Sequence, residues 1–188
     1  MLELIPINCL ILSYGDLESF DCGHKIINEY LIYEAKNKDS SNSAKTFVLR
    51  NEKDIVGFYT LTVGSLDVEN VATQTLHKQP IVNLAYFAID KRYQRKGYGS
   101  LLMQEVFRSV SVISYYTGIE FIYLESVDDS VQFYESLGFQ LVNIKARPEN
   151  YEISTDNIAF PMYISIKTLL EQGYIGYVRN FESINIIE

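Results

Sequence analysis

The sequence predicts a mixed α/β fold with one central, mixed β-sheet and helices on both of its faces. Three observations support this class. β-rich runs alternate with segments of helical periodicity, two β-rich runs are joined by a short polar turn, and an apolar run leads through a loop into an amphipathic helix. Such a chain combines hairpins and right-handed crossovers on one sheet. At 188 residues it has the size of a single domain, so we expect 1–188 to form one domain.

The N-terminal half is expected to contain a strand, a helix and a hairpin. Residues 2–12 are apolar, with several β-branched members, and predict the first strand. Apolar residues recur at helical spacing over 24–38 and predict a helix. The β-rich runs 46–50 and 55–63 predict the hairpin. Residues 67–80 are polar without a clear period, so we expect a loop or an irregular edge there.

The C-terminal half is expected to alternate strands with helices. Residues 81–89 are almost all apolar, as a central strand buried on both faces requires. A loop over 93–100 should open a helix whose buried face carries Leu102, Val106 and Val110, with Met103 and Phe107 beside them. Further strands are expected at 119–125, 139–145 and 158–166, a short helix at 128–137, and an apolar extension of unassigned role at 167–188.

Charge and composition limit the classes of function. The chain has 16 Lys+Arg against 24 Asp+Glu, a net charge of −8 and a pI near 4.8. This balance repels a phosphate backbone and attracts amines, although a local basic patch can override it. No apolar run reaches the roughly 18 residues of a membrane helix, and Cys9 and Cys22 lack the spacing of a metal clip. We expect a cytoplasmic protein with no membrane segment and no metal.

Residues 94–100, with the sequence QRKGYGS, predict an anion site. They precede a helix, whose first N–H groups are unpaired and carry partial positive charge. Gly97 and Gly99 remove side-chain atoms that would keep a phosphate away, and Arg95 and Lys96 add charge. A Walker A loop and a dinucleotide fingerprint both fail, the second because Leu102 stands where a glycine is needed. On spacing alone, a simple strand-to-helix turn remains the alternative.

Two motifs together resemble the GNAT superfamily of acetyl-CoA-dependent N-acetyltransferases. QRKGYG at 94–99 is similar to the superfamily's first signature, and FYESLGF at 133–139 is similar to its second. Residues 84–90 also look like its central strand, and the resemblance extends to residue 166. It implies the fold described above and acetyl-CoA as the acetyl donor. The segments 20–23, 27–31 and 55–61 resemble the branch that includes toxins acetylating aminoacyl-tRNA.

The candidate site residues follow from the resemblance and, for Glu125, from its expected position at the end of a strand. Tyr134 matches the tyrosine that protonates the leaving thiolate, although its helical spacing also suits a merely apolar face. Glu125 is a candidate base, with an exposed strand-end carboxylate as the alternative. Val127 stands where many relatives have a cofactor-binding asparagine. The expected cofactor-binding residues are Phe87, Ala88 and Ile89 for the pantetheine arm, and Gln94, Arg95, Lys96, Gly97, Tyr98, Gly99 and Ser100 for the diphosphate.

Three hypotheses about function follow. The first is an N-acetyltransferase acting on a primary amine of a small molecule, peptide or protein, which suits the acidic composition. The second is a toxin that modifies aminoacyl-tRNA, with tRNA and an antitoxin protein as partners. The third is a non-catalytic acyl-CoA-binding regulatory module, which would be indifferent to the loss of the Tyr134 hydroxyl. The apolar tail and the many tyrosines leave a homodimer open.

Overall fold

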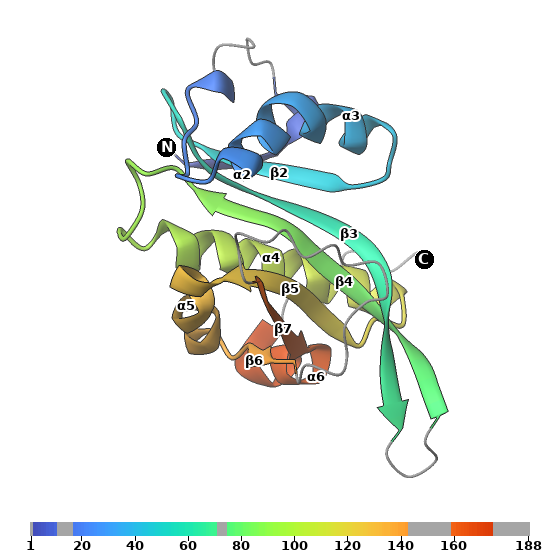
Figure 1. The fold of residues 1–188 in the computed structure, drawn as a ribbon. Helices are drawn as coiled ribbons and strands as arrows, with labels where there is room; N and C mark the ends of the chain where they lie inside the picture. Colours follow the sequence, from blue (N-terminus) through green and yellow to red (C-terminus); the bar gives the residue numbers. More distant parts are fainter. Residues whose placement is uncertain (1, 11–16, 71–74, 143–158, 175–188) are drawn as a thin grey trace, which may run out of the picture. The chain divides into compact units, whose positions relative to one another are not determined.

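The computed structural model describes residues 2–10, 17–70, 75–142 and 159–174 (Figure 1). The chain divides into two compact units. Unit 1 comprises Met1–Thr62 with Leu84–Val106, and unit 2 comprises Val63–Asn83 with Phe107–Glu188. Three elements, β3 (Ile55–Asn70), β4 (Thr75–Ile89) and α4 (Tyr98–Tyr116), supply residues to both units.

The described strands form a seven-stranded mixed sheet in the order β1-β2-β3-β4-β5-β7-β6. β4 and β5 run parallel, because α4 lies between them in the chain and returns it in the same direction. The pairs β1/β2, β2/β3, β5/β7 and β6/β7 are antiparallel. The predicted mixed sheet is confirmed. The remaining strands are β1 (Glu3–Pro6), β2 (Lys45–Arg50), β5 (Phe121–Val127), β6 (Gln140–Leu141) and β7 (Ala159–Ser165).

Unit 1 contains the predicted N-terminal helix. It runs through α2 (Lys25–Glu29), a π-helical segment η2 (Tyr30–Glu34) and α3 (Ala35–Ser40). Tyr30 stacks on Tyr86 of β4, with ring centroids 3.6 Å apart. A π-helical turn shifts the helical register, and such turns are frequent at functional sites. The core of this unit also buries Phe20, Leu31, Ala35, Val48, Ile55, Phe58 and Ala88.

The buried hydroxyl of Tyr30 has no hydrogen-bond partner among the described residues. We expect Tyr30→Phe to stabilise the protein by about 1 kcal/mol, because an unsatisfied buried polar group carries a desolvation cost. This gain corresponds to about 2–4 °C in Tm for a chain of this size. Tyr123→Phe is the contrast, since the hydroxyl of Tyr123 donates to Glu125 at 3.0 Å. Thermal unfolding should show Tm rising in the first variant and falling in the second, and a fall in both would contradict the prediction.

Unit 2 takes its core from α4, the sheet and the C-terminal helices. Phe107 of α4 stacks on Phe139 and makes an edge contact with Tyr174. The first helical part of the tail, α6 (Ile166–Leu169), buries Leu169 completely, and η4 (Leu170–Tyr174) follows it. The tail therefore covers the core as far as residue 174. The buried face predicted for α4 is confirmed, since Leu102, Met103, Val106, Phe107 and Val110 are all at most 3% exposed.

Two predictions about the N-terminal half are wrong. The strand expected over 2–12 ends at Pro6, which lacks the N–H needed to continue a ladder, and a 3₁₀ turn η1 (Ile7–Cys9) follows. Residues 67–80, expected to form a loop or an irregular edge, are instead regular strand over most of their length, because β3 extends to Asn70 and β4 begins at Thr75. Hydrogen bonding between strands does not require alternating apolar residues, so polar strands such as these leave little signal in the sequence pattern.

The predictions for the C-terminal strands stand in part. β7 confirms the run at 158–166, and β5 confirms the run at 119–125. The strand expected over 139–145 is observed only as β6, and residues 143–158 lie outside the described part of the chain. The helix expected over 128–137 is present as a 3₁₀ turn, η3 (Asp128–Ser130), followed by α5 (Val131–Ser136). Residues 175–188 also lie outside the described residues.

Candidate active site

The loop that predicts an anion site is attached to the end of β4 through Asp90. The carboxylate of Asp90 is 1% exposed and accepts backbone N–H groups from Asp21 at 3.1 Å and Arg92 at 2.9 Å. The guanidinium of Arg92 adds a bidentate contact, with Nε at 2.8 Å and Nη2 at 2.9 Å. Burial opposes ionisation of Asp90, but these hydrogen bonds outweigh it and hold its pKa below the usual value. The carboxylate therefore anchors the start of the loop.

Gln94 fastens the same loop to two other segments. Its amide nitrogen donates to the carbonyl oxygens of Cys22 at 2.9 Å and Ile89 at 2.8 Å. The backbone N–H of Lys91 donates to the carbonyl of Asp21 at 2.8 Å. The structure thus directs the amide nitrogen of Gln94, expected to meet the diphosphate, toward the protein itself. This nitrogen fixes the shape of the loop.

The loop then turns outward at residues 95–100, which form an open cradle. Arg95 and Gly97 both adopt left-handed backbone conformations, with φ of 58° and 85°. A Cβ on Gly97 would meet no atom within 4 Å, so the space above it is free. The first hydrogen bond of α4 joins the N–H of Leu101 to Gly97 O, which leaves the N–H groups of 98–100 without an acceptor in the helix. Successive N–H groups in such a turn favour a bound anion.

Two cations of the loop remain available for an anion. Lys91 pairs with Asp21 at 3.0 Å, and Arg92 is neutralised by Asp90 and Asp54. Arg95 and Lys96 form no ion pair with a carboxylate in the described part of the chain, and both are exposed. The loop therefore presents two cations beside the helix N-terminus, which fits the expected diphosphate. Tyr98 and Gly99 are half-buried and Ser100 is exposed in the first turn of α4.

Arg95 has both a strained backbone conformation and a positive charge. Its replacement by glycine should change stability through the first and ligand affinity through the second. A left-handed conformation costs a non-glycine residue about 1–2 kcal/mol. We expect Arg95→Gly to raise the free energy of unfolding by about 0.5–1 kcal/mol and to weaken acetyl-CoA binding about tenfold through the lost charge. Asn42→Gly is the control, because Asn42 also has a positive φ of 61° but lies outside the loop. Calorimetry that finds unchanged affinity in Arg95→Gly would contradict the assignment.

The strand segment expected to bind the pantetheine arm depends on a glycine of the neighbouring strand. Ala88 and Ile89 are buried, and Phe87 is half-buried. A Cβ on Gly57 of β3 would lie 2.6 Å from Ala88 O and from Ile89 Cδ1, so only glycine allows β3 to approach this segment. Reasoning from the sequence missed Gly57, although an isolated glycine within the β-rich run 55–63 is the signal for such close approach. The parallel pairing of β4 with β5 covers only Ile81–Asn83 on β4, before these residues.

In unit 2, the second motif forms a helix end that fixes Tyr134. The N–H of Phe139 bonds Tyr134 O at 3.1 Å, and the N–H of Gly138 bonds Glu135 O at 3.0 Å. These two bonds, with Gly138 at φ 94°, define a Schellman motif. Its usual apolar contact is the edge-to-face pair of Tyr134 and Phe139, at 5.7 Å. The phenylalanine and glycine of the motif therefore orient the tyrosine.

Burial determines the chemistry available to Tyr134. Its side chain is 7% exposed, and desolvation raises the pKa of the phenol well above its usual value. The group therefore keeps its proton at neutral pH and can donate a hydrogen bond. A tyrosinate left behind would be costly, so any proton given to a thiolate must be recovered at once. Full proton transfer from this phenol is therefore less favourable than from an exposed one, whereas hydrogen-bond donation remains available.

Glu125, the expected base, is exposed on β5 and accepts the hydroxyl of Tyr123 at 3.0 Å. Its position agrees with the alternative of a strand-end carboxylate as well as with a role through water. Val127 is the N-cap of η3 and Ser130 that of α5. Neither makes a side-chain capping bond, and the neighbouring acidic residues Asp128 and Asp129 occupy neither cap position. Both acidic residues lie within the 3₁₀ turn instead.

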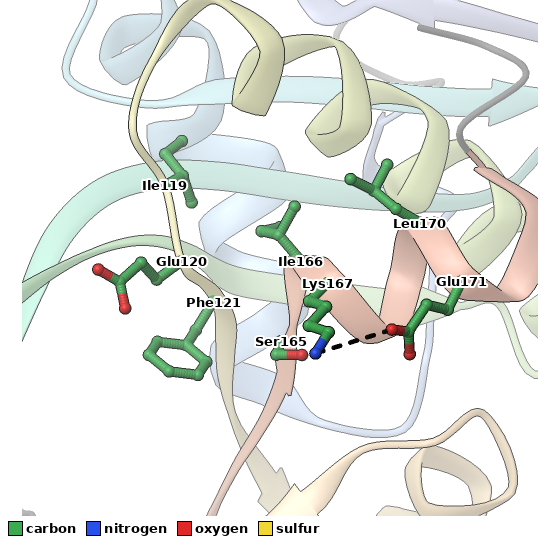
Figure 2. A pocket seen from close by; sticks show the side chains of 8 residues that line it. All are labelled: Ile119, Glu120, Phe121, Ser165, Ile166, Lys167, Leu170 and Glu171. Atoms are coloured by element: carbon green, nitrogen blue, oxygen red, sulfur yellow. Dashed lines mark ion pairs between the residues drawn. The ribbon is translucent and has the colours of Figure 1, made fainter.

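A hollow of about 650 Å³ elsewhere in unit 2 contains none of the predicted site residues (Figure 2). Ile119, Phe121, Ile166 and Leu170 line it, and Lys167 and Glu171 form an ion pair at its rim (Figure 2). It has no cluster of groups suited to acyl transfer. The described residues include no group of three or more potential metal ligands. Within the same residues, no helix is long and apolar enough to cross a membrane.

Comparison with known proteins identifies the family. The sequence model of the acetyltransferase (GNAT) domain matches residues 42–141, which is more than half of the chain. The chain therefore belongs to the GNAT family. It is an acetyl-CoA-dependent N-acetyltransferase, with acetyl-CoA as donor, as the glycine loop and the second motif predict.

Several relatives are toxins. A tRNA-acetylating toxin of Mycobacterium tuberculosis is 24% identical over 131 residues, covering 67% of this chain and 79% of that protein. A mutant of the toxin AtaT, bound to the C-terminus of the antitoxin AtaR and acetyl-CoA, has a TM-score of 0.69 at 22% identity, covering 92% of this chain and 98% of its own. AtaT complexed with acetyl-methionyl-tRNAfMet also has a TM-score of 0.69 at 22% identity, with coverages of 92% and 99%. These structures support the fold.

Proposed function

We propose that the chain transfers the acetyl group of acetyl-CoA to the α-amino group of an aminoacyl-tRNA. The observation that carries this proposal is the relationship to the tRNA-acetylating toxin, which spans 79% of that protein's length. In the reaction, the amine nitrogen attacks the thioester carbon and the C–S bond breaks. The proton lost by the amine balances the proton gained by the thiolate of CoA. Aminoacyl-tRNA is thus preferred as the acceptor over the amine of a small molecule, peptide or protein, which the acidic composition had favoured.

The proposed donor machinery uses the residues expected from the sequence. The cradle at Arg95–Ser100 would hold the diphosphate, and backbone groups of Phe87–Ile89 would bind the pantetheine arm and polarise the carbonyl. Tyr134 would donate a hydrogen bond to the departing thiolate, since burial keeps its phenol protonated. Gln94 would act by shaping the cradle, because its amide nitrogen contacts protein carbonyls.

The basicity of the acceptor supports an α-amine. An α-amino group has a pKa of about 7.7–8.0, against about 10.4 for a lysine side chain, so on the order of a few hundred times more of it is neutral at pH 7. A neutral amine needs no strong base to attack a thioester. Glu125, the candidate base, is exposed and engaged by Tyr123. An aminoacyl ester therefore suits the groups that the chain offers.

The charge distribution removes part of the objection that an acidic protein repels tRNA. Unit 1 contains 10 Lys+Arg and 11 Asp+Glu, a net charge of −1, and it includes the four cations at 91–96. Unit 2 contains 6 Lys+Arg and 13 Asp+Glu, a net charge of −7. The negative charge is thus concentrated in unit 2. This same charge is the observation that favours a cationic small-molecule amine as the second candidate acceptor.

Acetyl transfer to a panel of acceptors tests the proposal. The purified protein is incubated with labelled acetyl-CoA and total aminoacylated tRNA, uncharged tRNA, spermidine or a lysine-containing peptide. We expect label in the charged tRNA alone, sensitive to rising salt because phosphate contacts contribute to binding. Label in spermidine or the peptide, with none in charged tRNA, would establish the second candidate. By analogy with AtaT and AtaR, we also propose a protein partner of the antitoxin class.

A further inference from the structure

Tyr93 occupies a junction between the β2–β3 turn and the cradle. Its hydroxyl donates to Asp54 Oδ2 at 2.7 Å and accepts from Asn51 Nδ2 at 2.9 Å. Its ring makes an edge contact with Tyr98, the first residue of α4, at 5.6 Å and 88°. The ammonium of Lys96 lies over the same ring, 5.9 Å from its centroid. One side chain therefore connects a turn of the sheet to the helix start and to a cradle cation.

The turn that receives the hydroxyl is rigid in its own right. Asn51 Oδ1 accepts the N–H groups of Lys53 and Asp54, each at 2.8 Å. The N–H of Asn51 also donates to Asp54 O at 3.0 Å. The other oxygen of Asp54 takes Arg92 Nη1 at 2.6 Å, so both carboxylate oxygens face the loop. A turn held by three internal hydrogen bonds offers a fixed point for Tyr93.

The bond between Tyr93 and Asp54 keeps one direction over the working pH range. The hydrogen bond to Asp54 raises the pKa of the phenol, and the hydrogen bond from Tyr93 lowers the pKa of the carboxyl group. Tyr93 therefore remains the donor and Asp54 the charged acceptor. Such charge-assisted bonds are stronger and shorter than neutral ones.

Lys96 has few other constraints on its position. Its ammonium donates to Arg92 O at 2.7 Å, and its remaining described contact is the face of Tyr93. Exposed lysine side chains lose rotamer entropy when they bind an anion. A lysine already held over a fixed ring loses less, so its charge contributes more to affinity.

We propose that Tyr93 is a positioning residue for the diphosphate end of acetyl-CoA, acting through Lys96 and held in place by the Asp54 carboxylate of the β2–β3 turn. This inference rests on the proposed donor site and is independent of the acceptor. It assigns the turn at 51–54, which lies outside both motifs, a part in donor binding. The effect is on affinity for the donor and leaves the chemical step unchanged.

Tyr93→Phe tests the proposal, since it removes the hydroxyl and keeps the ring. Calorimetry should find the Kd for acetyl-CoA raised about three- to tenfold, with kcat at saturating donor within about twofold of the wild type. Asp54→Asn should give a similar loss. Tyr163→Phe is the matched control, because it deletes a hydroxyl that donates to Gln140 at 3.2 Å within unit 2.

A double-mutant cycle shows whether Tyr93 acts through Lys96. In a Lys96→Met background, Tyr93→Phe should have no further effect on the Kd. Competition by S-acetylpantetheine, which lacks the diphosphate, should be equal in wild type and Tyr93→Phe. The proposal would be overturned by an unchanged Kd in Tyr93→Phe and Asp54→Asn, or by additive losses of affinity in the cycle. It would also be overturned if Tyr93→Phe weakened binding of S-acetylpantetheine as much as binding of acetyl-CoA. Failure of the wild type to acetylate charged tRNA would overturn only the proposed function.

Discussion

Replacing Gly97 by glutamate is expected to weaken acetyl-CoA binding about 100-fold or more. Gly97 lies in the cradle with nothing within 4 Å of a would-be Cβ, so the first atom of the new side chain meets no protein atom and the side chain extends into the space proposed for the ligand. Its carboxylate also repels the diphosphate and neutralises the field of Arg95 and Lys96. Isothermal calorimetry of purified wild type and variant measures the loss.

Gly173→Glu is the control for backbone strain, because it introduces the same side chain at another glycine with a positive φ. Gly173 also has a positive φ, 105°, and open space around its would-be Cβ, but it belongs to η4 of unit 2. Both variants should lose about 1–2 kcal/mol of stability to the left-handed conformation. Only Gly97→Glu should lose acetyl-CoA. Equal binding by the two variants would mean that the loop is a structural turn.

Tyr134→Phe is expected to reduce kcat about 10²–10³-fold while leaving the Kd for acetyl-CoA unchanged. The phenol is buried and protonated, and the Schellman contact with Phe139 orients its ring. Phenylalanine keeps that contact and removes the hydroxyl that we propose to donate to the thiolate. Single-turnover kinetics with radiolabelled acetyl-CoA separate the chemical step from binding.

Tyr163→Phe is again the control, with kcat and Kd expected to be unchanged. Thermal unfolding should show that the wild type, Tyr134→Phe and Tyr163→Phe are all folded. A Tyr134→Phe variant that turns over at the wild-type rate would contradict the proposed hydrogen bond from Tyr134 to the thiolate. The acetyl-CoA site would be unaffected by that result, and the thiolate would depart without a hydrogen-bond donor from the protein. A raised Kd would show instead that the hydroxyl binds the donor in the ground state.

The sequence predicts the parts of this fold that have strong periodicity or demanding backbone chemistry. The buried face of α4 follows from apolar residues at helical spacing, and each is buried as expected. Gly97 and Gly138 both adopt the left-handed conformation that only glycine tolerates readily. Each belongs to one of the two family motifs, so the motifs mark positions where the backbone requires glycine.

Other features depend on contacts that local sequence does not encode. The π-helical segment Tyr30–Glu34 interrupts a helix whose composition gives no sign of it. Gln94 matches the motif, yet its amide nitrogen bonds two backbone carbonyls, one of them 72 residues away in the chain. Tyr93 lies beside the motif, and its partners at 51 and 54 come from a turn that reads only as a polar link. Tertiary context determines each of these roles.

The most direct test of the account is the chemical identity of the product formed on tRNA. Total aminoacylated tRNA is incubated with the protein and acetyl-CoA, the ester bond is hydrolysed under mild base, and the released amino acids are analysed by mass spectrometry. We expect amino acids that carry one acetyl group on the α-nitrogen, and we expect none of them when Gly97→Glu replaces the wild type. Unmodified amino acids, from a protein that binds acetyl-CoA and acetylates a small amine, would contradict it.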